Sequence, residues 1–271
     1  MSDLLYIPDS IAQSLPANNQ FNAIMQLSGK VFRDVPGRKT LQVKLQEKSY
    51  FVKQHYGVGW VEIFKALASF KKPILDATTE VHAIQKLEMV GIPTTPLVAY
   101  GTRGVNPANI QSFVVTEDLG EIVSLEELCA DWKVNPPDYL FKQKLIIALA
   151  QLSTKLHGAG LCHRDYYLCH FVLKKTDLIK GDINLILIDL HRMLLNQHPN
   201  GVGVMKDIAA LMFSSMDSGF NAEDWALFKQ HYLPQSDSFW KQVRRRAEQL
   251  YQKFHSEKFQ KRLNVEKSAI D

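Results

Sequence analysis

Four charged residues follow one another along the chain in an order that could transfer a phosphoryl group. Lys53 falls in a strand-like segment, Glu80 opens a helical one, Asp165 sits in a His-Arg-Asp triplet and Asp189 follows an apolar strand. In phosphoryl transfer, a Lys neutralises nucleotide phosphates, a Glu fixes that Lys, one Asp accepts the proton of the attacking hydroxyl and another holds Mg²⁺. Each residue alone is common, but this order predicts a protein-kinase-like phosphotransferase.

The segment around Asp165, "LCHRDYYLCHFVL", also contains Leu-Cys-His twice, which raises the alternative of a metal site. Zinc sites favour spacings such as Cys-x₂-Cys and His-x₃₋₅-His, which the pairs Cys162-His163 and Cys169-His170 do not have. Adjacent Cys and His side chains also point in different directions on an extended backbone. We therefore expect the cysteines to be buried packing residues, and the triplet His163-Arg164-Asp165 to form a catalytic loop.

The elements that must position these residues can be read from periodicity and turn signals. Residues 1–26 show no strong period and are expected to form a leader. The next segments predict a small antiparallel sheet with one main helix over roughly the first 118 residues. The expected elements are three strands within Val31–His55, a short amphipathic helix over 60–70, a clearer helix over 76–92, and strands over 96–104 and 111–119.

Beyond Leu119 the pattern becomes mostly helical. Ser124 and Glu127 form a predicted capping box, and residues 137–160 form a long apolar helix. The buried strand "LILIDLHRM" ends at Asp189, and further helices are expected over 205–219 and from Phe239 onward. The fold class is therefore predicted as α+β: a bilobal protein-kinase-like fold with a small β-rich N-lobe over 1–118 and a larger, mostly helical C-lobe over 119–271.

Composition and charge limit the possible partners. The 271 residues include no stretch approaching the ~20 apolar residues of a membrane span, and the N-terminus lacks the pattern of a signal peptide. Three cysteines, an odd number, also favour a reducing, cytoplasmic setting. The net charge of +4 is concentrated in residues 241–262, which hold eight Lys/Arg and two Glu. One basic segment argues against a general nucleic-acid coat and for a local anionic partner.

Several stretches closely resemble the lipopolysaccharide core heptose(I) kinases of Gram-negative bacteria. They are "FVKQHYGVGWVEIFK", "GIPTTPLVAYGTRGVNPANIQSFVVTEDL", "LCHRDYYLCHFVL" and "LILIDLHRM". The resemblance runs from about Gly29 to Arg192 and continues more loosely to the C-terminus. It implies ATP-dependent phosphorylation of the first heptose of the inner core, on a glycolipid acceptor at the cytosolic face of the inner membrane. It also implies possible association with acyl carrier protein.

Together, the kinase pattern and this resemblance give the candidate residues their roles. Within the catalytic triplet His163-Arg164-Asp165, Asp165 would act as the base and Arg164 would tether the loop. Lys53 would hold the phosphates and Glu80 would orient it. Adenine would be received by backbone groups of a hinge over Glu117–Leu119. Asp189 would bind Mg²⁺.

Two departures from the protein-kinase pattern stand out. His170 occupies the place of the second metal-binding Asn, although Mg²⁺ prefers oxygen ligands. Either one Mg²⁺ is held mainly by Asp189, or His170 acts differently, for example through water. The Gly-rich loop is also missing: Gly37 is the only glycine between the first two strands. The side chains of Arg38 and Lys39 beside it are expected to contact phosphates instead.

Alternative functions remain open at this level. One alternative is a kinase that acts on protein tyrosines, suggested by Tyr166 and Tyr167 beside Asp165. A second is a related Kdo-type sugar kinase, and a third is a non-catalytic pseudokinase. For the basic C-terminal helix, the cations either form only a solvated face or contact an anionic partner, which would be the inner membrane or acyl carrier protein.

Overall fold

The computed structural model describes residues 4–68 and 75–268, which divide into two compact units. The first unit comprises the chain up to Gly120 together with Leu187–Met193, and the second comprises Glu121–Ile186 with the chain from Leu194 onward. Among the described residues, no helix is both long and apolar enough to cross a membrane.

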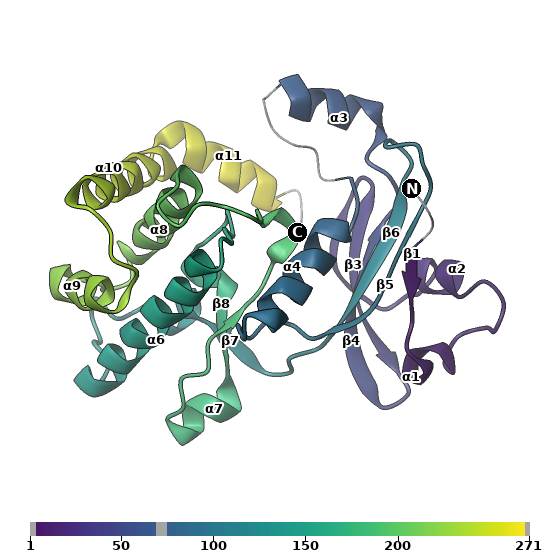
Figure 1. Cartoon of the computed structure of the whole chain (residues 1–271), viewed down its shortest axis with the longest axis horizontal. Helices are drawn as coiled ribbons and strands as arrows, with labels where there is room; N and C mark the ends of the chain where they lie inside the picture. Colours follow the sequence, from purple (N-terminus) through teal and green to yellow (C-terminus); the bar gives the residue numbers. More distant parts are fainter. Residues whose placement is uncertain (1–3, 69–74, 269–271) are drawn as a thin grey trace. The chain divides into compact units, whose positions relative to one another are not determined.

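The first unit is built on a six-stranded antiparallel sheet in the order β1-β5-β6-β4-β3-β2 (Figure 1). Its strands are β1 (Leu4–Tyr6), β2 (Lys30–Val35), β3 (Arg38–Leu45), β4 (Lys48–His55), β5 (Leu97–Arg103) and β6 (Gln111–Glu117). Its helices are α1 (Asp9–Ala12), α2 (Gln20–Met25), α3 (Gly59–Ala68), α4 (Thr78–Met89) and the 3₁₀ turn η2 (Leu190–Arg192). The strands predicted over 31–55, 96–104 and 111–119 are thus present.

The expectation of a leader over residues 1–26 is wrong. Strand β1 pairs with β5, with Leu4 opposite Thr102, and helices α1 and α2 bury Ile11, Phe21 and Ile24 in the core on one face of the sheet. These elements are only three to six residues long. Segments this short are held by tertiary packing, and they are too brief to show a sequence period.

Strand alternation sorts the side chains of β3 and β4 onto two faces. Leu41 lies opposite Val52 on the core face, where both are at most 1% exposed. Because successive side chains point to opposite faces, Thr40 and its partner Lys53 lie on the other face. The helix α4 supplies Glu80 to that face. The alternation in the sequence therefore separates the apolar core from the charged residues.

The second unit is mostly helical, with a small sheet in the order β7-β8-β9. Its strands are β7 (Ile122–Ser124), β8 (Phe171–Lys174) and β9 (Ile186–Leu187), of which Ile186 belongs to this unit. Its helices are α5 (Leu125–Leu128), α6 (Tyr139–Gly158), η1 (Leu168–His170), α7 (Lys175–Lys180), α8 (Val202–Ser215), α9 (Ala222–His231), α10 (Asp237–Phe254) and α11 (Glu257–Ser268).

Side-chain caps mark where several of these helices begin. The predicted capping box is present: Ser124 Oγ accepts the amide of Glu127 at 3.1 Å, and the Glu127 carboxylate accepts the amide of Ser124 at 2.8 Å. Asn221 and Asp224 form a second box at the start of α9. An ion pair of 2.6 Å between Lys142 and Asp224 then joins α6 to α9.

The basic segment predicted as one C-terminal helix is divided between α10 and α11, because the first helix ends at Phe254. As predicted, α10 buries one face within the second unit. Phe239, Val243 and Ala247 are buried, and α10 packs against α8. In the helical order of α10, the basic residues fall on the opposite, exposed face.

Candidate active site

The pair that sequence order singled out in the first unit is in contact. Lys53 Nζ lies 2.5 Å from Glu80 Oε1, and the side chain of Glu80 is only 5% exposed. The lysine comes from β4 and the glutamate from the first turn of α4, whose apolar residues Val81, Ile84 and Leu87 are buried. A nearly buried carboxylate needs a cation beside it, so packing of α4 and pairing of Lys53 depend on each other.

The β2–β3 turn holds Arg38 beside this pair. Gly37 has φ +78°, and its carbonyl accepts the amide of Tyr56 at 2.8 Å. A Cβ added to Gly37 would lie 2.4 Å from the carbonyl oxygen of Gly57, so only glycine fits there. Burial lowers the pKa of Arg38, while the carboxylates of Glu80 and Asp189 oppose that shift. Arg38, Glu80 and Asp189 are thus electrostatically coupled within the first unit.

Asp189 occupies a left-handed conformation two residues after the end of β9. Its φ is 64°, and its Oδ1 lies 2.6 Å from Nδ1 of His191. The strand is shorter than predicted, because it covers only Ile186–Leu187. Leu187 is tied to the segment after α4, since Thr94 Oγ1 donates to its carbonyl at 2.7 Å. A carboxylate at this position is a hard-oxygen donor of the kind Mg²⁺ prefers.

The predicted hinge contains a carboxylate that the sequence analysis did not single out. Asp118 Oδ2 accepts from Gln42 at 2.6 Å and from Ser49 at 2.8 Å, and Oδ1 accepts the amide of Gly120 at 2.9 Å. Partial burial raises the pKa of Asp118, but these hydrogen bonds outweigh it and the pKa lies below its usual value. Asp118 thus pins the chain after β6 to strands β3 and β4.

Two backbone amides of the predicted hinge donate hydrogen bonds within the first unit. Glu117 donates to the carbonyl of Pro96 at 3.0 Å, and Asp118 donates to that of Ser49 at 3.2 Å.

In the second unit, the His-Arg-Asp loop is held by a buried carboxylate. Asp207, on α8, is 1% exposed and accepts the amide of His163 at 2.6 Å and that of Arg164 at 2.9 Å. Arg164 has φ 72° and an exposed side chain, so its backbone makes this tether. Asp207 was missed from the sequence, where "MKDIAALMFSS" shows only an acidic residue in an apolar helix. An acidic residue in an apolar helix could have identified it, because a buried carboxylate needs hydrogen-bond donors beside it.

Asp165 is braced from the other side by His170. Nδ1 of His170 lies 2.6 Å from the backbone carbonyl of Asp165, so the imidazole donates through this nitrogen. The ring of His170 also lies 5.5 Å from that of His163. The residue in place of the second metal-binding Asn thus shapes the loop.

The tyrosines and cysteines of the loop are packing residues to different degrees. Tyr166 is 0% exposed, and its hydroxyl bonds Ser153 at 2.8 Å; burial raises its pKa well above the usual value. Tyr167 is half-buried and makes an edge contact with Phe213. Burial raises the pKa of Cys162 to about 12. A buried thiol of that kind stays protonated, and Cys162 is fully buried, as expected of a packing residue.

Within residues 4–68 and 75–268, no group of three or more His, Cys, Asp or Glu side chains is arranged to hold a metal ion. Mg²⁺ keeps several waters and is usually bound by one or two carboxylates together with substrate phosphates. Asp189 fits that role with its own carboxylate, whereas a site made wholly of protein ligands does not fit the residues present.

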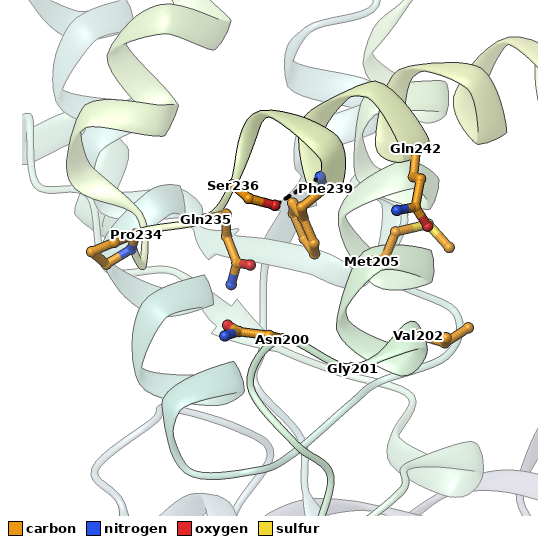
Figure 2. A pocket seen from close by; sticks show the side chains of 9 residues that line it. All are labelled: Asn200, Gly201, Val202, Met205, Pro234, Gln235, Ser236, Phe239 and Gln242. Carbon is orange, nitrogen blue, oxygen red and sulfur yellow. Dashed lines mark hydrogen bonds between the residues drawn. The ribbon is translucent and has the colours of Figure 1, made fainter.

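Two pockets lie in the second unit, away from these residues. The smaller, of about 200 Å³, lies where α8 and α10 begin, and Ser236 caps α10 there by accepting the amide of Phe239 at 3.2 Å (Figure 2). The larger is a groove of about 630 Å³ between α8, α9 and α10. None of the residues predicted for nucleotide, metal or catalysis belongs to either lining, both of which lie within the described chain.

The α+β architecture and the ordered set of Lys53, Glu80, Asp165 and Asp189 define a kinase-like phosphotransferase. Comparison with known proteins makes this specific: residues 22–232 match the profile of the lipopolysaccharide kinase (Kdo/WaaP) family. The chain belongs to this family, as its sequence motifs predicted, and the expected fold class is confirmed.

Individual relatives are named as lipopolysaccharide core heptose(I) kinases. The chain is 38% identical over 231 residues to the lipopolysaccharide core heptose(I) kinase WaaP of Escherichia coli K12, covering 84% of this chain and 87% of the relative. It is 41% identical over 214 residues to WaaP of Pseudomonas aeruginosa PAO1, covering 79% and 80%. A solved structure, "WaaP in complex with acyl carrier protein", matches with a TM-score of 0.78 at 34% identity, covering 92% of this chain and 99% of that one.

Proposed function

We propose that the chain phosphorylates the first heptose of the lipopolysaccharide inner core, with ATP as phosphoryl donor. The observation that carries this proposal is the Lys53–Glu80 pair in the unit that also holds Asp189, together with an Asp165 loop held by Asp207 in the other. The relatives at 38–41% identity are named heptose(I) kinases, which favours heptose over a Kdo-type acceptor.

We assign the residue roles on the contacts described above. Lys53, positioned by Glu80, would neutralise nucleotide phosphates, and Arg38 would assist it at the β2–β3 turn. Because the amides of Glu117 and Asp118 have internal partners, Leu119 offers the next amide for adenine. These assignments place the nucleotide contacts of the first unit on β3, β4, α4 and the hinge.

The chemical step would use Asp165 to align the heptose hydroxyl and accept its proton while the oxygen attacks the γ-phosphorus. The bond from that phosphorus to the β,γ-bridging oxygen breaks, and ADP leaves. His170 and Asp207 would keep Asp165 in place through the backbone. Asp189 would hold Mg²⁺, which when bound neutralises charge on the phosphates.

Mass spectrometry tests the activity directly. Purified core lipopolysaccharide lacking this phosphate, incubated with the protein, ATP and Mg²⁺, should gain one phosphate on a heptose. Lys53→Ala should raise the KM for ATP, lower turnover, or both, and Glu80→Ala should do so more weakly. Lys65, which forms an exposed ion pair with Glu62 on α3, provides the control variant Lys65→Ala. A phosphate gained on Kdo, or none on any sugar, would contradict the assignment.

A kinase acting on protein tyrosines is the weaker candidate. Tyr166 is fully buried and so cannot reach a catalytic centre in the folded chain, which leaves the half-buried Tyr167 as the candidate beside Asp165. Phosphopeptide mapping after incubation with ATP, with and without the glycolipid, separates the two functions.

The basic face of α10 is the proposed contact with an acidic partner, acyl carrier protein. Arg244, Arg245 and Arg246 are exposed, and Arg244 also borders the groove of about 630 Å³. The solved relative whose name includes this partner supports the choice. Changing the three arginines together to Gln should weaken binding of the carrier protein, and the difference from wild type should shrink as the salt concentration rises.

The same face could also hold the enzyme weakly at the cytosolic surface of the inner membrane, where basic residues contribute ~1 kcal/mol each. Co-sedimentation with vesicles containing anionic lipid, at two salt concentrations, tests this. If vesicle binding is insensitive to salt, or is unchanged in the triple variant, the basic residues of α10 contact only solvent and not the membrane.

A further inference from the structure

The face of the sheet that carries Lys53 also carries two buried nitrogen atoms without a hydrogen-bond partner. Among the described residues, these are Nε of Arg38 and Nε2 of His55. His55 is 3% exposed, although it is a polar residue at the end of a strand. Buried polar atoms nearly always have partners, so each exception calls for an explanation, such as an ion or ligand that belongs there.

These two atoms come from neighbouring residues. Arg38 lies directly opposite His55 in the pairing of β3 with β4, and Thr40 lies opposite Lys53. Directly opposed residues have Cβ atoms about 4.5–5.5 Å apart and share a face of the sheet. Lys53 is on this face too, two residues before His55. The two unpartnered nitrogens and the Lys53 ammonium therefore gather at one end of the sheet.

Their chemistry suits a phosphate oxygen. The Arg38 guanidinium can only donate hydrogen bonds, and neutral imidazole can donate through Nε2. Burial first, and then the positive charges of Arg38 and Lys53, lower the pKa of His55 to about 4, while Asp76 opposes the shift. His55 is therefore neutral at pH 7. It can donate to an anion while adding no further repulsion to the two cations beside it.

The register of β4 gives these donors a place along the nucleotide. Tyr50 pairs with Glu117 at the hinge, Lys53 pairs with Val114, and His55 pairs with Ser112. A nucleotide that begins at the hinge and follows this strand meets Lys53 first. At ~3.3 Å per residue, His55 lies roughly 7 Å further on. The phosphate farthest from the adenine is the one that reaches His55.

We propose that Arg38 and His55 together bind the terminal phosphate of the nucleoside triphosphate and so distinguish it from the diphosphate. This inference rests on the proposed ATP-dependent function.

Binding measurements by calorimetry, with Mg²⁺ and no acceptor, test the pair without relying on turnover. The ligands are ADP and the non-hydrolysable analogue with a β,γ-imido bridge. His55→Phe removes the donor at similar volume, His55→Gln restores a donor, and His82→Phe is the control, because His82 is an exposed histidine on α4. His55→Phe should weaken the triphosphate analogue about tenfold or more, the scale of a lost hydrogen bond to a charged group. ADP should change less than twofold, and His55→Gln should recover part of the loss.

Arg38→Lys tests the same proposal independently if His55→Phe does not fold. It keeps the charge and lacks the Nε donor, so it should also weaken the triphosphate analogue more than ADP. Equal losses for both nucleotides, or no loss, in the folded variants would overturn the inference. Those outcomes leave the proposed function standing as long as the wild-type chain binds ATP and transfers its phosphate. A wild-type chain that does neither would overturn both.

Discussion

The two groups of candidate residues are held in different ways. In the first unit, Lys53 and Glu80 are held by each other's charge, across β4 and α4. In the second unit, the loop of Asp165 is held by its backbone, whose amides donate to the buried carboxylate of Asp207. A charge pair can rearrange when an anion arrives, because the anion competes for the cation. A backbone tether is independent of the ligand, and therefore suits a residue that must stay in place.

The largest expected effect is at the tethered loop itself. Asp165→Asn should leave the fold and nucleotide binding nearly unchanged but reduce turnover about 10²-fold or more, the scale for losing a positioned base. Phosphate transfer to the core sugar is the measurement, and Asp182→Asn, an exposed carboxylate of the same unit, is the control. Turnover at the wild-type rate would remove Asp165 from the mechanism.

The tether is broken by Asp207→Asn. The change removes a charged acceptor from the amides of His163 and Arg164, and bonds to charged groups are worth ~1.5–3 kcal/mol. The free energy of unfolding in urea should fall by an amount in that range, and turnover should fall with it. Nucleotide affinity should stay close to wild type if the first unit holds its charges by itself. A loss of affinity equal to the loss of turnover would mean that the two groups are not held separately.

The pH dependence of stability sharpens the account of the first unit. His55 has a native pKa of about 4 against 6.5 in the unfolded chain, and faces Arg38, Lys53, Asp76 and His191. Between these values the unfolded state binds a proton that the native state does not, so stability falls as the pH falls from 6.5 toward 4. From pH 7 to 5 this loss is about 2 kcal/mol. Urea unfolding at both pH values should show a smaller loss for His55→Gln; equal losses in the two chains would argue against a neutral His55.

The smallest expected effect comes from the N-cap of α5, a solvent-exposed contact in which a side chain also accepts a backbone amide. Ser124 accepts the amide of Glu127 at the start of α5, as Asp207 accepts amides in the core. Ser124→Ala should lower the free energy of unfolding by only ~1 kcal/mol, since water replaces the lost cap. Thermal and urea unfolding measure the difference. A cost as large as that of Asp207→Asn would show that burial does not set the strength of such tethers.

Much of this arrangement could be predicted from the sequence, and the reasons for the rest are physical. Strands β2 to β6 and helices α4, α6, α8 and α10 have clear periods or turn signals. The capping box at Ser124 has a local signature. Elements of three to six residues, such as β1 and α1, have no period to detect.

The same distinction applies to the candidate site. Lys53, Glu80, Asp165 and Asp189 could be identified because kinase-like order fixes where each one falls. Asp207 and Asp118 were missed, since their partners lie 44 and 76 residues away and only the fold brings them together. His55 was missed because only the pairing of β3 with β4 sets it opposite Arg38. His191 was missed although its partner Asp189 is two residues away. The role of His170 was left open in the sequence, and its bond to the Asp165 carbonyl is a finding of the structure.

The complete burial of Tyr166 has a consequence for how the chain can be modified. Its hydroxyl is bonded to Ser153 inside the second unit and is shielded from any other protein. A phosphate could be added there only while this unit is open, for example on a newly made chain. A modified Tyr166 would then introduce about two negative charges into the buried site it shares with Ser153 and Asp207, and keep the unit from closing. A chain phosphorylated at Tyr166 would therefore be unable to fold its second unit and would be inactive.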